Sequence, residues 1–74
     1  MLPQEWRQAS GLSQAEVAKL LGLEGKNPSR TWQRYETGER QPRPGIIVAV
    51  ERISKGKVTA RSWETVRLRR QQAA

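Results

Sequence analysis

Apolar residues along this chain recur at spacings of three and four, the period of an amphipathic α-helix, and the alternation typical of a half-buried strand is almost missing. We therefore expect an all-α fold, a compact bundle of four to five short helices. The pattern places these helices at about residues 3–10, 13–21, 28–37, 45–54 and from 59 or 62 to 70.

The first predicted helix opens with Pro3. Proline suits the first helical turn because the backbone N–H groups of that turn have no partner within the helix, and proline has no N–H to leave unpaired. Leu2, Trp6 and Ala9 follow one another at spacings of four and three, which places them on one face of the helix. Gly11 is expected to end the helix.

The second predicted helix begins with a capping box. Ser13 is followed three residues later by Glu16, so hydroxyl and carboxylate can each satisfy a free backbone N–H of the first turn. Val17, Ala18 and Leu21 are expected to face inward. The small side chain of Ala18 permits a close crossing with the next helix.

The third predicted helix begins at Asn27-Pro28, an N-cap acceptor followed by a residue without an N–H. Trp32 and Tyr35 lie on its inner face, and Gly38 closes it. The opposite face carries polar and basic side chains: Ser29, Arg30, Gln33 and Arg34.

The predicted helix 45–54 is apolar nearly all round, so it is either central or shares one face with another chain. A turn at 55–57 follows, with Val58 as an extended apolar plug. The last helix is expected to turn Trp63 and Val66 inward, and residues 69–74 are expected to form a frayed terminus. Its arginines are expected to point outward: Arg61, Arg67, Arg69 and Arg70.

Composition narrows the function. The chain has 74 residues, no His and no Cys, which removes zinc sites, disulfides and nucleophiles activated by His. We expect one cytoplasmic binding protein rather than an enzyme, without metal, cofactor or small-molecule substrate, since no cleft-forming length or paired carboxylates are evident. No apolar run approaches the roughly 20 residues that span a bilayer.

The formal net charge is +7, which indicates a polyanionic partner. Residues 51–74 carry seven basic and two acidic side chains, whereas residues 1–50 carry seven and five. Two short helices joined by a turn, with an exposed basic and amide-bearing face on the second, form the pattern of a helix-turn-helix reader of double-stranded DNA.

Residues 12–23 (LSQAEVAKLLGL) and 31–42 (TWQRYETGERQP) strongly resemble the Xre-type family of lambda-repressor-like and Cro-like DNA-binding domains, over about residues 3–54. The resemblance implies a helical bundle that binds operator DNA, usually as a homodimer on a palindromic site. Residues 51–62 are similar to the tail of phage Cro-like regulators, which favours a phage or mobile-element repressor. We divide the chain into a DNA-binding domain (1–58) and a basic C-terminal helix or tail, a possible dimerisation element (59–74). The arginines of this tail either track DNA phosphates or are solvated charges on a dimerisation helix.

The resemblance also implies roles for single residues. Gln14 would contact a DNA phosphate and the end of the recognition helix, and Arg7 would pair with Glu36. Ser29, Arg30 and Arg34 match positions that reach base edges, with Gln33 beside them, and Arg40 and Arg43 match a loop that grips the sugar-phosphate backbone. The turn at 23–27 is about four residues longer than in relatives, and its Lys26 is expected to add a phosphate contact.

Alternatives stay open for several of these residues. The arginines of the third helix either contact DNA or form a solvated face, Gln33 either binds adenine or faces water, and Ser29 either contacts a phosphate or satisfies a local amide. Trp32 and Trp63 either stack on unpaired bases or, as their spacing favours, pack in the core. The competing functions are a protein-interaction module that binds nucleic acid without sequence preference, and an antitoxin or controller protein with the same fold.

Overall fold

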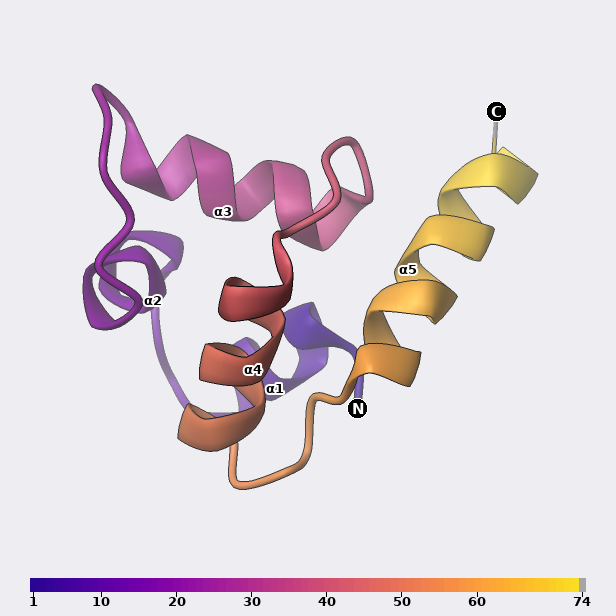
Figure 1. Ribbon diagram of the computed structural model, residues 1–74, viewed down its shortest axis with the longest axis horizontal. Helices are drawn as coiled ribbons and strands as arrows, with labels where there is room; N and C mark the ends of the chain where they lie inside the picture. The colour runs from indigo at the N-terminus through magenta and orange to yellow at the C-terminus, as the bar shows by residue number, and fades with distance from the viewer. Residues whose placement is uncertain (74) are drawn as a thin grey trace.

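Five α-helices form the computed structural model of this chain, which describes residues 1–73. Within these residues there is no strand, so the predicted all-α class is confirmed. Ala74, the last residue of the predicted tail, lies outside the described residues. The helices are α1 (Pro3–Ala9), α2 (Gln14–Leu20), α3 (Pro28–Thr37), α4 (Pro44–Ile53) and α5 (Ala60–Ala73) (Figure 1).

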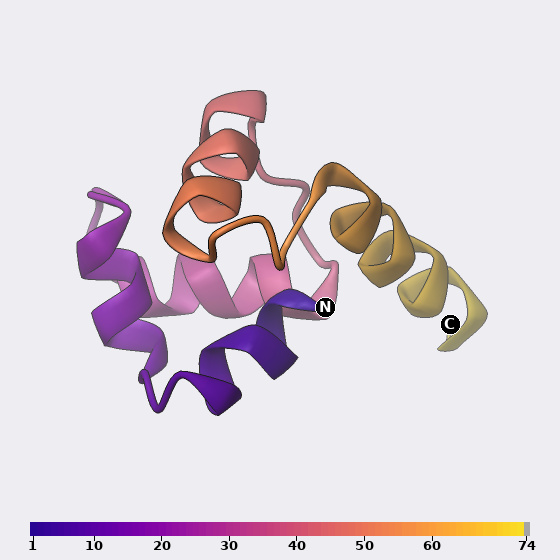
Figure 2. The ribbon, with the colours of Figure 1, turned by 90° about the horizontal axis from the view of Figure 1, so that it is seen from below.

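The helices surround one core. In Figure 1, α3 runs across the top of the molecule, α2 lies at its left end, and α4 stands below it with α1 behind. Figure 2 shows the same bundle from below, with α1 in front and α5 on the side opposite α2. The radius of gyration of the Cα atoms is 11.3 Å, which matches the roughly 11 Å expected for a compact domain of this length.

Local signals placed the helix ends well. α3 spans the predicted residues 28–37, α1 ends one residue early, and α4 begins one residue early because Pro44 occupies its first turn. α5 departs more: it continues to Ala73, so the expectation of a frayed end from residue 69 is wrong for the described residues. After Val66 this segment contains only Arg, Leu, Gln and Ala, all good helix formers.

The core is built around aromatic residues from α1, α3 and α5. Trp32 is fully buried, and its ring lies nearly perpendicular to those of Tyr35 and Trp63, at centroid distances of 6.3 and 5.8 Å. The core interpretation of Trp32 and Trp63 is therefore confirmed, and neither ring is available to stack on bases. The other buried apolar side chains include those predicted for α2, the plug and α5: Trp6, Val17, Ala18, Val50, Val58 and Val66.

The exposed residues of α1 and α4 refine the predicted faces. Ala9 is exposed, because the buried stripe of α1 runs through Pro3, Trp6 and the half-buried Arg7, and Ala9 lies to one side of it. Of the two alternatives for α4, the central position does not hold, because only Val50 is buried and Val48 is 54% exposed. The other alternative, a face shared with a second chain, stays a prediction. α4 packs at the edge of the bundle, so one of its apolar sides faces solvent.

Candidate nucleic-acid interface

α2 and α3 form the rigid base of the candidate site. The predicted capping box opens α2: the backbone N–H of Glu16 donates to Ser13 Oγ (3.1 Å), and that of Ser13 donates to Glu16 Oε1 (3.0 Å). The hydrogen bond from the backbone N–H of Ser13 and, second, the interaction with its hydroxyl hold the pKa of the Glu16 carboxyl below its usual value. Val17 and Ala18 are fully buried, and α2 packs closely against α3.

A buried carboxylate ties three helices together. Glu36 of α3 lies 2.6 Å from Arg7 Nε of α1, and its side chain is only 3% exposed. Trp32 Nε1 donates to the same carboxylate at 2.6 Å, and Gln14 Nε2 donates to it at 3.1 Å. Because these donors come from α1, α2 and α3, the carboxylate orients α3 within the bundle.

The Arg7–Glu36 pair implied by the family resemblance is present, and it is more buried than an ordinary surface ion pair. Gln14 also reaches the end of α3, as the resemblance implied, through its hydrogen bond to Glu36. Its side chain is half-buried at the start of α2. The predicted phosphate contact of Gln14 stays a prediction.

The polar face of α3 is turned outward. Arg30 and Gln33 are exposed, and Arg34 and Ser29 are half-buried. This face forms one wall of a hollow of about 410 Å³, hereafter the α3 hollow. Residues of α3, its N-cap, the following loop and α5 line it: Asn27, Ser29, Arg30, Gln33, Arg34, Thr37, Glu39 and Arg70.

Arg34 is not tucked into the fold. Its side chain is 39% exposed, and its nearest acid is Glu39, with 4.0 Å between Arg34 Nε and Glu39 Oε2. An ion pair this long and this exposed contributes little stability, so the guanidinium of Arg34 is available to an external acceptor.

The N-terminus of α3 is capped as predicted. Asn27 Oδ1 accepts the backbone N–H of Arg30 (3.2 Å) and the hydroxyl of Ser29 (3.1 Å). The hydroxyl of Ser29 is therefore engaged locally by the side-chain amide of Asn27, in line with the alternative that Ser29 satisfies a local amide. Its contact with a phosphate stays a prediction.

The long connection between α2 and α3 carries Lys26, which is exposed. The connection leaves α2 through Gly22 in a left-handed conformation (φ 66°) and crosses to α3 at the far left of Figure 1. Lys26 lines neither the α3 hollow nor the second hollow described next.

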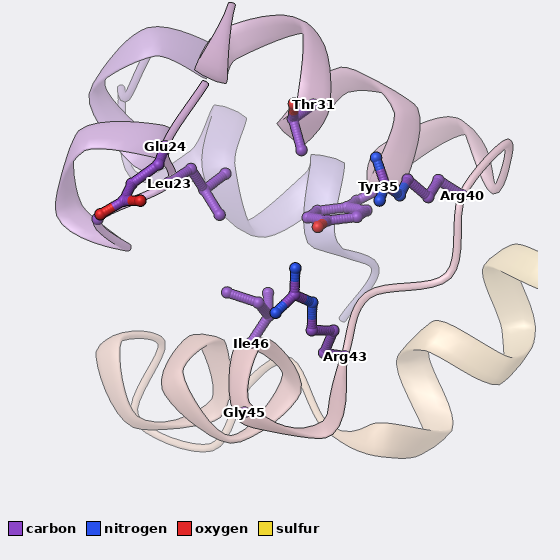
Figure 3. Close-up of a pocket in the computed structure, with 9 residues that line it drawn as sticks. Leu23, Glu24, Thr31, Tyr35, Arg40, Arg43, Gly45 and Ile46 are labelled. Carbon is purple, nitrogen blue, oxygen red and sulfur yellow. The ribbon is translucent and has the colours of Figure 1, made fainter. Parts of the chain in front are cut away.

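A second hollow, of about 460 Å³, lies between α3 and α4 (Figure 3). Arg40 and Arg43 line it, and the guanidinium of Arg43 extends into it beside Ile46 and toward Tyr35. The backbone N–H of Arg40 donates to the carbonyl of Arg34 at 3.2 Å, which ties this loop to the end of α3. The remaining lining residues are Gly22, Leu23, Glu24, Thr31 and Gly45.

The predicted site residues thus fall into groups. Ser29, Arg30, Gln33 and Arg34 share one hollow, Arg40 and Arg43 share the other, Gln14 lies at Glu36, and Lys26 stands apart in the turn.

The sequence interpretation missed two neighbours of the recognition face. Thr37 lies one turn beyond Gln33, so helical spacing alone could have included it. Arg70 lies 33 residues further along the chain, and no local signal indicates that it lines the same hollow.

Among residues 1–73, no three acidic side chains come together in a way that could hold a metal ion, and no helix is long and apolar enough to cross a membrane.

Comparison with known proteins adds one finding. A family described as "Helix-turn-helix domain" matches residues 4–56, which include α2 to α4 and all of α1 except Pro3. No curated protein and no solved structure matches the chain significantly.

Proposed function

This chain belongs to the helix-turn-helix domain family, and from that premise we propose that it is a sequence-specific regulator of transcription that binds double-stranded DNA. The proposal is for a binding protein without catalytic activity. Its finer form is a Cro-like repressor of the Xre type, encoded by a phage or mobile element, that occludes a promoter.

One observation carries the proposal: α3 is anchored on one side and free on the other. Its buried side is held by Trp32, Tyr35 and the hydrogen-bonded Glu36. Its outer side presents guanidinium and amide groups over the α3 hollow. A rigid helix with such a face fits the major groove, whose base edges offer matching acceptors and donors.

The residues then divide by task. Arg30 and Arg34 each present a planar fork to the two acceptors of guanine, and Gln33 binds adenine through both groups of its amide. These contacts supply sequence preference. Phosphate contacts set the position of the protein on the duplex, and we assign them to Gln14, Lys26, Ser29, Arg40 and Arg43.

The proposed regulator acts as a homodimer on a palindromic operator. The exposed Val48 of α4 supports this, because it leaves an apolar side chain available to a second copy. Two-fold symmetry would set two copies of α3 about 34 Å apart, one helical turn of DNA. Sedimentation that finds only monomer at tens of micromolar, both free and on its operator, would overturn the dimer.

Selection of bound fragments from random duplex DNA tests the function. We expect a palindromic consensus, with half-sites separated by about ten base pairs or a multiple. Recovery of fragments without a shared sequence, together with a steep salt dependence, would instead support a module that binds nucleic acid without sequence preference. A consensus found beside a toxin or restriction gene would favour the antitoxin or controller variant.

A further inference from the structure

The C-terminal helix joins the recognition face through a close contact at Gly38. This glycine ends α3 in a left-handed conformation (φ 80°). A Cβ placed on it would lie 3.1 Å from the Cβ of Arg70, and 3.2 Å from Cγ1 and from the carbonyl oxygen of Val66. α5 therefore crosses the end of α3 so closely that a side chain at Gly38 would push against Val66 and Arg70.

The position of α5 is set by its buried side chains. Trp63 is 2% exposed and Val66 is 7% exposed, and the Trp63 ring lies 5.8 Å from that of Trp32. Arg70 follows Val66 by four residues, so it lies on the same side of α5, one turn farther toward the C-terminus. Packing of the core thus determines where Arg70 emerges.

Arg70 emerges at the α3 hollow. There it joins Arg30 and Arg34 against a single carboxylate, that of Glu39, which leaves the hollow with two net positive charges. Among residues 1–73, Arg70 has no acidic partner within ion-pair distance, whereas Arg67 of the same helix pairs with Glu64. A cluster of unneutralised guanidinium groups is unfavourable alone and favours an incoming anion.

The C-terminal end of α5 also lies on the same side of the molecule as α3. In Figure 1 it rises to the level of α3, and in Figure 2, seen from below, α5 extends away from the viewer, toward the back of the molecule where α3 lies. A duplex lying along the outer face of α3 would therefore meet the last turns of α5.

We propose that α5 is a second DNA-contacting element, in which Arg70 binds a backbone phosphate of the same duplex whose major groove receives α3. This inference rests on the proposed function and deepens it. It assigns the end of the basic helix to DNA, where the sequence left a choice between phosphate tracking and dimerisation. Phosphate contacts carry no sequence information, so Arg70 strengthens binding to every duplex and helps to orient α3.

The test is the salt dependence of binding to a random-sequence DNA duplex, compared between the parent protein and Arg70→Ala. The slope of log affinity against log salt is negative, and each lost phosphate contact makes it shallower by about one unit. We expect that loss for Arg70→Ala, with several-fold weaker binding at low salt. Arg70→Lys keeps the charge and should retain the parent slope.

Arg61→Ala is the matched control. Arg61 is exposed on the first turn of the same helix and does not line the α3 hollow, so its loss removes the same charge and should leave the slope unchanged. Arg43→Ala is the positive control, because Arg43 is assigned to a phosphate by the proposed function. Circular dichroism and sedimentation should show the same fold and association state for every variant.

The outcomes separate the two proposals. If Arg43→Ala lowers the slope and Arg70→Ala does not, the role of α5 is overturned and the proposed function stands. If Arg70→Ala changes the association state, or if Arg61→Ala lowers the slope equally, a specific phosphate contact is also overturned. A parent protein that does not bind duplex DNA overturns the proposed function itself.

Discussion

Arg7 Nε lies 2.6 Å from Glu36 Oε2, and this ion pair between α1 and α3 is almost closed to solvent, with side-chain exposures of 13% and 3%. The second nitrogen of the guanidinium, Nη2, reaches Glu36 Oε1 at 3.3 Å, and Nη1 donates to the carbonyl of Leu12 at 3.1 Å. Arg7 therefore connects the beginning of the chain to the base of α3, the helix that we assign to the major groove.

Removal of Arg7 should destabilise the whole domain. We expect Arg7→Met to lower the free energy of unfolding by about 3 kcal/mol, because it leaves a buried carboxylate without its cation. Adding Glu36→Gln should restore part of that loss, since a neutral amide can still accept from Trp32. Denaturant unfolding of both variants measures the coupling. A loss for Arg7→Met of no more than the roughly 0–1 kcal/mol of an exposed pair would contradict this assignment.

Substitution of Gly38 should cost more than left-handed strain alone. An L-residue in this conformation costs about 1–2 kcal/mol, and in Gly38→Ala the new methyl group would also crowd Val66 and Arg70. Gly22→Ala is the matched control, because Gly22 has a similar φ of 66° and no atom within 4 Å of its would-be Cβ. Chemical denaturation should show the larger loss for Gly38→Ala. Equal losses would mean that α5 is not held tightly against α3.

Arg34→Ala should remove sequence preference without unfolding the domain. A bidentate contact to guanine contributes about 1–3 kcal/mol, so discrimination between the selected operator and a random duplex should fall about tenfold or more. The fold should persist because the only ion pair of Arg34 in residues 1–73 is long and exposed. Arg52→Ala, an exposed arginine on α4, controls for net charge. Unchanged discrimination in fluorescence-anisotropy titrations would remove Arg34 from the reading face.

The capping box of α2 should contribute to acid sensitivity. The pKa of Glu16 is lowered in the folded state by its hydrogen bonds to Ser13. Its stabilising effect is therefore complete above the unfolded pKa of about 4.3, and it is lost as the pH falls through the lower, folded pKa. We expect the melting temperature of Glu16→Gln to depend less on pH in this range than that of the parent protein. Superimposable melting curves at each acidic pH would exclude a contribution from Glu16.

The candidate site was predictable where it lies on one helix. Ser29, Arg30, Gln33 and Arg34 lie within six residues of one another, and the helical period alone places them on one face. The hydrogen bond from Gln14 to Glu36 was anticipated only through family resemblance. Arg70 was placed on an outward face but not beside Arg34, because the path of α5 depends on how Trp63 packs.

The amino-acid sequence by itself determined the helices, their caps and the two faces of α3. These features depend on interactions between residues three or four apart, such as Ser13 with Glu16 and Asn27 with Arg30, which are the same in any fold that contains the segment. Only the tertiary structure decided that α4 lies at the edge of the bundle, and that α5 brings Arg70 to the α3 hollow. Both depend on contacts between residues distant in the chain, which no local pattern encodes.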